Sequence, residues 1–150
     1  MLRIIDLLSP EDIGLDVRAM SKKHVLLELA RMLATRSGLL DTPIFQALAD
    51  RENLGTTGFG QGIAVPHARL RELGTTHAAL VRLAEPVDFD AGDDRPVDLV
   101  CAIIGPEGST QEPFEALVSA CRVLRNPETL AKLRQAGSAA AVHSILAEAV

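Results

Sequence analysis

The 150-residue chain has the length of one domain, and its apolar fraction of 47% and charged fraction of 23% are typical of a globular protein with a buried core. It contains four Phe but no Tyr or Trp, and so lacks the rings on which single-stranded nucleic acids usually stack. The net charge of −5 would repel a phosphate backbone, and no apolar run reaches the ~20 residues that span a bilayer. These features argue against nucleic-acid binding and membrane insertion.

The cysteines and the N-terminal segment indicate a cytoplasmic protein. Cys101 and Cys121 both lie in apolar segments, which is typical of buried, reduced thiols. The first eight residues include the acidic Asp6 and show no signal-peptide pattern. We therefore expect a single cytoplasmic domain over residues 1–150.

The first part of the chain predicts one strand and two helices. Residues 13–18 alternate in hydropathy as a short strand does. A helix is expected from the N-cap Ser21 to Gly38, because apolar side chains recur between them at helical spacing. A second helix opens with Pro43 at its first position and carries Arg51 at its end.

The middle of the chain predicts strands. Four glycines within residues 55–62 exclude a helix and predict a loop or tight hairpin that leads into a short strand at 63–65. Residues 78–84 and 97–104 are apolar and suit buried strands. Turns are expected at 85–86 and 91–94, on either side of a short segment at 87–90.

The last third predicts a loop at 105–110 followed by three helices. The first helix carries one apolar stripe, formed by Phe114, Leu117, Val118, Cys121 and Leu124. Asn126 and Pro127 end this helix and start another, and Ser138 caps an alanine-rich third. The order of elements predicts an α/β or α+β fold in which helices cover a sheet.

His67 is the strongest candidate for a reactive side chain. It follows Pro66, which favours an extended residue before it, so the imidazole would project from a sheet edge at a fixed angle. A neutral imidazole is a nucleophile near pH 7. Arg51 and Arg69 are candidate donors, because a guanidinium can hold two phosphate oxygens. Together these residues predict a histidine that accepts a phosphoryl group.

The glycine-rich loop adds backbone donors to this prediction. Amides around Gly60 and Gly62 can converge on an anion without side chains in the way. A nucleotide-binding loop is excluded, because no Lys-Ser or Lys-Thr follows and no helix opens where one is required. The four histidines are scattered and show no metal-ligand spacing, so the sequence gives no indication of a metal site.

Residues 51–69 read RENLGTTGFGQGIAVPHAR, which resembles the signature of the type-2 enzyme IIA domain of the bacterial phosphotransferase system. This type includes the fructose, mannitol and nitrogen-regulatory members. The resemblance continues through residues 83–90, 96–100 and 124–128, and so covers nearly the whole chain. It implies a mixed β-sheet flanked by helices and a phosphotransferase that needs no cofactor.

The resemblance further implies a phosphorelay in which His67 accepts a phosphoryl group from an HPr-like phosphocarrier. Arg51 and Thr57 match the positions that line the histidine's pocket in this family. Transport members then pass the group to an enzyme IIB domain. The chain departs from the family at Pro113, which stands where many members have a second histidine beside the acceptor.

Several functions remain open at this stage. The leading one is a freestanding phosphocarrier of the nitrogen-regulatory branch that controls transporters or kinases, because no IIB or membrane domain is fused to it. One alternative is a fructose-type sugar-transport IIA subunit that donates to a IIB domain. Another, suggested by Pro113, is a regulatory binding module of the same fold that does not transfer phosphate. A hydrolase with His67 as general base is disfavoured, because no serine or cysteine nucleophile is visibly paired with it.

Overall fold

Six strands form one mixed β-sheet in the computed structural model, which describes residues 1–149. They are β1 (Ile13–Val17), β2 (Gly58–Gly60), β3 (Ile63–Ala64), β4 (His67–Leu70), β5 (His77–Val87) and β6 (Val97–Pro106). The antiparallel pair β5 and β6 forms the centre, and β1 runs parallel to β5 on one side. On the other side β3 and β4 follow one another along β6, both parallel to it. β2 pairs with β3 as a hairpin, whereas β4 has β6 as its strand partner and leaves its other edge open.

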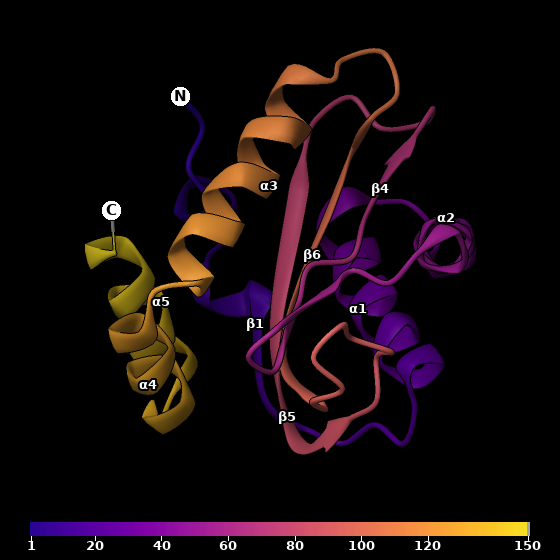
Figure 1. Cartoon of the computed structure of the whole chain (residues 1–150). Coiled ribbons are helices and arrows are strands. Elements are labelled where there is room, and N and C mark those ends of the chain that lie inside the picture. Colours follow the sequence, from indigo (N-terminus) through magenta and orange to yellow (C-terminus); the bar gives the residue numbers. More distant parts are fainter. Residues whose placement is uncertain (150) are drawn as a thin grey trace.

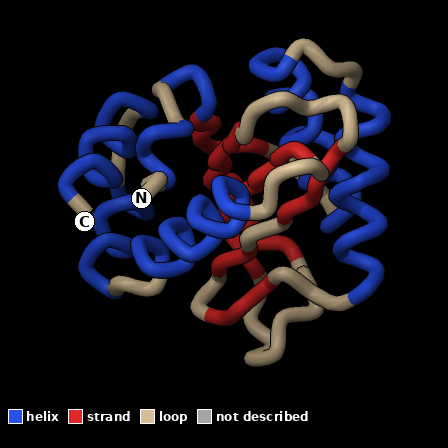
Figure 2. The backbone as a smooth tube through the Cα atoms, turned by 90° about the horizontal axis from the view of Figure 1, so that it is seen from above, coloured by secondary structure: helices blue, strands red, loops and turns tan. Residues whose placement is uncertain are grey.

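Over the same residues, five α-helices cover the two faces of the sheet (Figure 1). One face carries α1 (Lys22–Ser37) and α2 (Asp41–Leu54), and the other carries α3 (Gln111–Leu124), α4 (Pro127–Gln135) and α5 (Ala139–Glu148). Figure 2 shows the strands between these two groups of helices. Alternation along β6 sends Cys101 and Ile103 into the core under α3, and Ala102 and Ile104 into the core under α1 and α2. The predicted mixed sheet flanked by helices is confirmed.

Helix boundaries are confirmed where a cap residue marks them. Gly38, with a φ of +80°, ends α1 in the left-handed conformation that glycine favours. Two predicted N-caps, Ser21 and Ser138, accept backbone hydrogen bonds through their side chains. Asn126, predicted with Pro127 to start a helix, caps α4 in the same way. The predicted start of the second helix is wrong, because α2 begins at Asp41 and Pro43 is its third residue. Proline is tolerated there, since the first-turn N–H groups have no intrahelical partner.

The turn predicted at residues 85–86 is wrong, because β5 continues through it to Val87. Val87 pairs with Val97 of β6, after a shift of register that begins at Arg82. This irregularity interrupts the regular ladder of hydrogen bonds, so Pro86, which has no N–H, can remain within the strand.

The buried face of α3 differs from the predicted stripe. Ala116 and Ala120 are fully buried against the sheet, whereas Phe114 is 65% exposed. Pro113 explains this rotation, because it lies directly on Gly105 of β6, where an added Cβ would overlap its ring. Ala116 and Ala120, three and seven positions after Pro113, therefore face the sheet.

Gly105→Ala is expected to lower the free energy of unfolding by about 1–3 kcal/mol, because the new Cβ would overpack against the Pro113 ring. Chemical denaturation measures this change. Gly108→Ala is the matched control, since nothing lies within 4 Å of its added Cβ, and it should stay within about 1 kcal/mol of wild type. Equal stability of the two variants would contradict the close contact.

Candidate functional site

A groove of about 780 Å³ crosses the open edge of β4 between α2 and α3. His67 and Arg69 of β4 line it together with Arg51 of α2 and Pro113 of α3. The structure therefore brings the predicted acceptor and both predicted arginines to one site. Two exposed apolar side chains also line the groove, Leu54 at the end of α2 (86% exposed) and Phe114 at the start of α3 (65% exposed).

A hydrogen bond to a backbone carbonyl group nearby in the sequence holds the His67 ring. Its Nδ1 lies 2.9 Å from the carbonyl oxygen of Val65, two residues earlier. A carbonyl oxygen only accepts, so Nδ1 carries the proton and donates it. In the neutral ring, Nε2 then holds the free electron pair and is the nucleophilic nitrogen. The half-buried ring faces the α3 side of the sheet, because its pairing partner Ile103 belongs to the core on that side.

The backbone of β4 supplies hydrogen-bond donors to the same edge. The carbonyl oxygens of Pro66 and Leu70 accept from the Ile103 and Glu107 amides on the β6 side. Because backbone groups alternate in direction along a strand, the N–H groups of His67 and Arg69 point away from β6 toward the open edge. These amides, rather than those of the glycine loop, border the acceptor.

The two arginines reach the groove from different elements. Arg51 lies in the last turn of α2, and its Nη1 donates to the Gly55 carbonyl oxygen at 2.9 Å. This bond orients the guanidinium and leaves its other N–H groups for a ligand. Arg69 is exposed on β4, two residues after His67 and on the same strand face, and it has no ion pair within residues 1–149. Both side chains are suited to bind an anion at the groove.

Thr57 is buried and does not line the groove. It donates its hydroxyl to Glu52 at 2.5 Å instead.

Gly60 and Gly62 lie elsewhere, contrary to the prediction from the glycine loop. The Gly62 carbonyl oxygen accepts from the amides of Asp98 and Leu99. Leu99 is four residues along β6 from Ile103, which pairs with His67, so Gly62 lies about 13 Å from the acceptor. Both glycines serve the β2–β3 hairpin, where their φ angles are +100° and +78°.

The N-terminus of α3 is a further part of the site, in keeping with the family position that Pro113 occupies. Thr110, which immediately precedes α3, lines the groove, and its side chain makes no capping hydrogen bond. The first N–H groups of a helix are unpaired and carry the positive end of its dipole. Pro113 contributes neither an N–H nor a side-chain donor to this end of the groove.

The cysteines differ from one another in burial. Cys101 is buried in β6, and desolvation raises the pKa of its thiol to about 12. Cys121 on α3 is only half-buried, contrary to the expectation that both thiols are buried, and desolvation again raises its pKa.

Residues 1–149 contain no group of three or more His, Cys, Asp or Glu side chains arranged to hold a metal ion. Over the same residues, no helix combines the length and the apolar character needed to cross a bilayer.

The chain belongs to the EIIA 2 family of the phosphoenolpyruvate-dependent sugar phosphotransferase system, which it matches over residues 6–149. It is 40% identical to a nitrogen regulatory protein of Bradyrhizobium diazoefficiens over 144 residues, which are 96% of this chain and 94% of the relative. The family resemblance inferred from the sequence is thereby confirmed.

Solved structures share the fold. The crystal structure of nitrogen regulatory protein IIA-Ntr from Neisseria meningitidis has a TM-score of 0.90 and 36% identity, covering 95% of this chain and 98% of that one. Enzyme IIA for mannitol from Escherichia coli, solved in complex with phosphorylated enzyme IIB, has a TM-score of 0.79 and 26% identity. That match covers 93% of this chain and 96% of the enzyme IIA chain.

The folded protein is expected to take a thiol-alkylating label at Cys121 well before Cys101, because only a thiolate reacts and Cys101 is fully buried with a pKa of about 12. Peptide mapping by mass spectrometry after reaction at pH 8 measures the order. Cys121→Ser should leave the folded protein unlabelled, and denaturant should expose Cys101 in both proteins. Rapid native labelling of Cys101 would contradict its burial.

Proposed function

We propose that this protein is a phosphocarrier of the phosphotransferase system that accepts a phosphoryl group on Nε2 of His67 and acts in the nitrogen-regulatory branch. The observation that carries the proposal is the bond from Nδ1 to the Val65 carbonyl oxygen, which leaves Nε2 as the nucleophile in a groove with two arginines. Membership of the family and similarity to nitrogen regulatory proteins support the branch.

The donor in this proposal is the phosphohistidine of a small HPr-like carrier. As the N–P bond in the donor breaks, the Nε2 electron pair of His67 forms the new N–P bond, and the donor imidazole leaves with its electron pair. Nδ1 keeps its proton throughout, so the step needs no general base. The Val65 carbonyl oxygen then stabilises the positive charge that the ring gains.

Stabilisation of the transferring group falls to donors around the groove. In phosphoryl transfer, charge spreads over three equatorial oxygens, and positioned donors are the main source of catalysis. Arg51 and Arg69, the open-edge amides of β4 and the N-terminus of α3 supply such donors. With Pro113 where the family often has a second histidine, the proposal assigns most of this stabilisation to the arginines and the backbone.

Phosphorylation would also change what the groove can bind. A phosphoryl group adds up to about two negative charges beside Leu54 and Phe114, which both line the groove. A partner that contacts this apolar surface in the unphosphorylated protein would be repelled by the added charge. Another partner could bind the phosphorylated protein through new pairs with the arginines. In the proposal these partners are an enzyme IIB domain, as in the mannitol complex, or a regulated transporter or kinase.

His67→Gln is expected to abolish phosphorylation, because glutamine has no nucleophilic ring nitrogen at the groove. Incubation with a phosphorylated HPr-like carrier, followed by intact-mass measurement, should show one phosphate on wild type and none on the variant. His24→Gln is the control, since His24 lies on α1 outside the groove, and it should be phosphorylated like wild type. Phosphate on His67→Gln would assign the role to another residue.

Arg51→Ala is expected to slow phosphorylation by about 10²-fold, the typical cost of removing one transition-state donor. The rate of phosphate transfer from the carrier, followed by rapid quench, measures the change. Arg31→Ala on the exposed face of α1 is the matched control and should react like wild type. A rate for Arg51→Ala within twofold of wild type would remove Arg51 from the mechanism.

The non-transferring binding module remains the second candidate, because Pro113 lines the groove without offering a donor. Wild-type protein that takes no phosphate from any phosphorylated HPr-like carrier would favour this candidate.

A further inference from the structure

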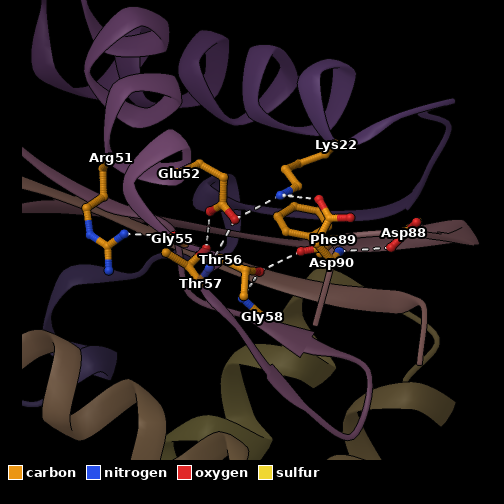
Figure 3. A network of polar contacts seen from close by, with 10 residues as sticks. All are labelled: Lys22, Arg51, Glu52, Gly55, Thr56, Thr57, Gly58, Asp88, Phe89 and Asp90. Atoms are coloured by element: carbon orange, nitrogen blue, oxygen red, sulfur yellow. Dashed lines mark hydrogen bonds and ion pairs between the residues drawn. The ribbon is translucent and has the colours of Figure 1, made fainter. Parts of the chain in front are cut away.

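Glu52 is a buried carboxylate that adjoins Arg51 on α2 but lies outside the groove (Figure 3). Its side chain is 3% exposed. It accepts three hydrogen bonds: from the Thr57 amide at 3.0 Å, from the Thr57 hydroxyl at 2.5 Å and from Lys22 Nζ at 3.1 Å. Burying a carboxylate is costly unless it is paired and hydrogen-bonded, so this full set of donors makes Glu52 a rigid anchor.

Lys22 provides the charge that pairs with Glu52. Its Nζ also lies 3.1 Å from Asp90 Oδ2 and 5.4 Å from the centre of the Phe89 ring. Desolvation acts to lower the pKa of Lys22, but the hydrogen bonds to Glu52 and Asp90 outweigh it, and the pKa is raised. Lys22 is therefore cationic at neutral pH and holds Glu52 as an acceptor, so the Thr57 hydroxyl must donate.

Two further hydrogen bonds connect this anchor to the acceptor histidine. The Thr57 carbonyl oxygen accepts from the Val65 amide at 3.1 Å, and the Val65 carbonyl oxygen accepts from His67 Nδ1 at 2.9 Å. Thr57 and Val65 are both buried, so water does not compete for these bonds. Glu52 holds Thr57 at two points, and a displacement of Thr57 would move the carbonyl group that orients the ring.

The same carboxylate holds one end of the turn that orients Arg51. Residues 55–57 turn back from the end of α2, and the Glu52 side chain holds this turn at Thr57 (Figure 3). Gly55, within this turn, donates its amide to the Glu52 carbonyl oxygen at 3.2 Å and accepts from Arg51 Nη1 at 2.9 Å. The Thr56 hydroxyl secures the turn from the other side through the Phe89 carbonyl oxygen.

We propose that Glu52, paired with Lys22, is a positioning residue for phosphoryl transfer. It acts through Thr57 to set the Nδ1–H tautomer and the orientation of His67, and, by fixing Thr57 at the end of the 55–57 turn, it steadies the Gly55 carbonyl group that orients Arg51. Thr57 thereby acts on the ring rather than on the phosphate. The kinetic part of this inference rests on the proposed function, whereas the tautomer of His67 does not.

Glu52→Gln tests the inference, because glutamine has nearly the same shape as glutamate. Its NH₂ group is a donor, however, and would face Lys22 or Thr57, which are also donors. Nitrogen-15 NMR of the unphosphorylated protein at pH 8 reports the tautomer of His67. Wild type should be mainly the Nδ1–H form, and Glu52→Gln should lose that preference. The rate of phosphorylation should fall about tenfold, with little change in the KM for the carrier, because the variant disturbs orientation and not docking.

Matched variants separate positioning from a general effect on the fold. Asp90→Asn removes the exposed partner of Lys22 but leaves the Glu52–Thr57 bonds, and should match wild type in tautomer and rate. Thr57→Val removes the hydroxyl at nearly constant shape and should shift the tautomer as Glu52→Gln does. Thr57→Ser should restore the preference that Thr57→Val loses.

An unchanged tautomer population in folded Glu52→Gln, or an equal change in Asp90→Asn, would overturn the inference. If Glu52→Gln does not fold, the Thr57→Val and Thr57→Ser pair decides, and equal tautomer populations in the two would overturn it. Wild-type protein that is never phosphorylated would defeat the proposed function alone, because the tautomer measurement needs no phosphate.

Discussion

The hydrogen bond from His67 Nδ1 to the Val65 carbonyl oxygen is the constraint on which the site depends. It joins residues only two apart, across Pro66, which fixes its own φ and restricts Val65 before it, so the contact that orients His67 is local. The bond decides which nitrogen holds the electron pair, and in the proposed reaction it would leave the positive charge of the phosphorylated ring beside a carbonyl dipole.

Topology creates the space around this histidine. β3 and β4 occupy one side of β6 in succession. The break at Val65 and Pro66 allows β4 to begin with His67 at an edge that no other strand of residues 1–149 covers. α2 ends and α3 begins on opposite sides of that edge. Arg51, in the last turn of α2, and the N-terminus of α3 therefore meet at the same groove. An open strand edge is usually a liability, and here its free amides face the site where an anion would bind.

Rigidity of the site comes from the buried polar residues behind the groove. Glu52 and Lys22 carry opposite charges in a largely buried environment, and each neutralises the charge of the other. The Glu52 carboxylate also accepts two hydrogen bonds from Thr57. On the opposite face, the contact between Pro113 and Gly105 sets the rotation of α3 and leaves Phe114 exposed at the groove. Polar contacts therefore stabilise the groove from one face of the sheet, and packing shapes its surface from the other.

The sequence by itself determined the features that depend on neighbours along the chain. The caps Ser21 and Ser138 act within four residues, and the Asn126-Pro127 pair marks a helix boundary directly. The Pro66-His67 pair lies within one long motif, so local chemistry was sufficient to identify all of these features. Only the tertiary structure decided that Gly60 and Gly62 lie away from His67, that the Thr57 hydroxyl serves Glu52, and that Phe114 is exposed. Each of these depends on strand register or on the rotation of a helix against the sheet. Those are set by contacts between residues far apart in the chain, on which the local pattern carries no information.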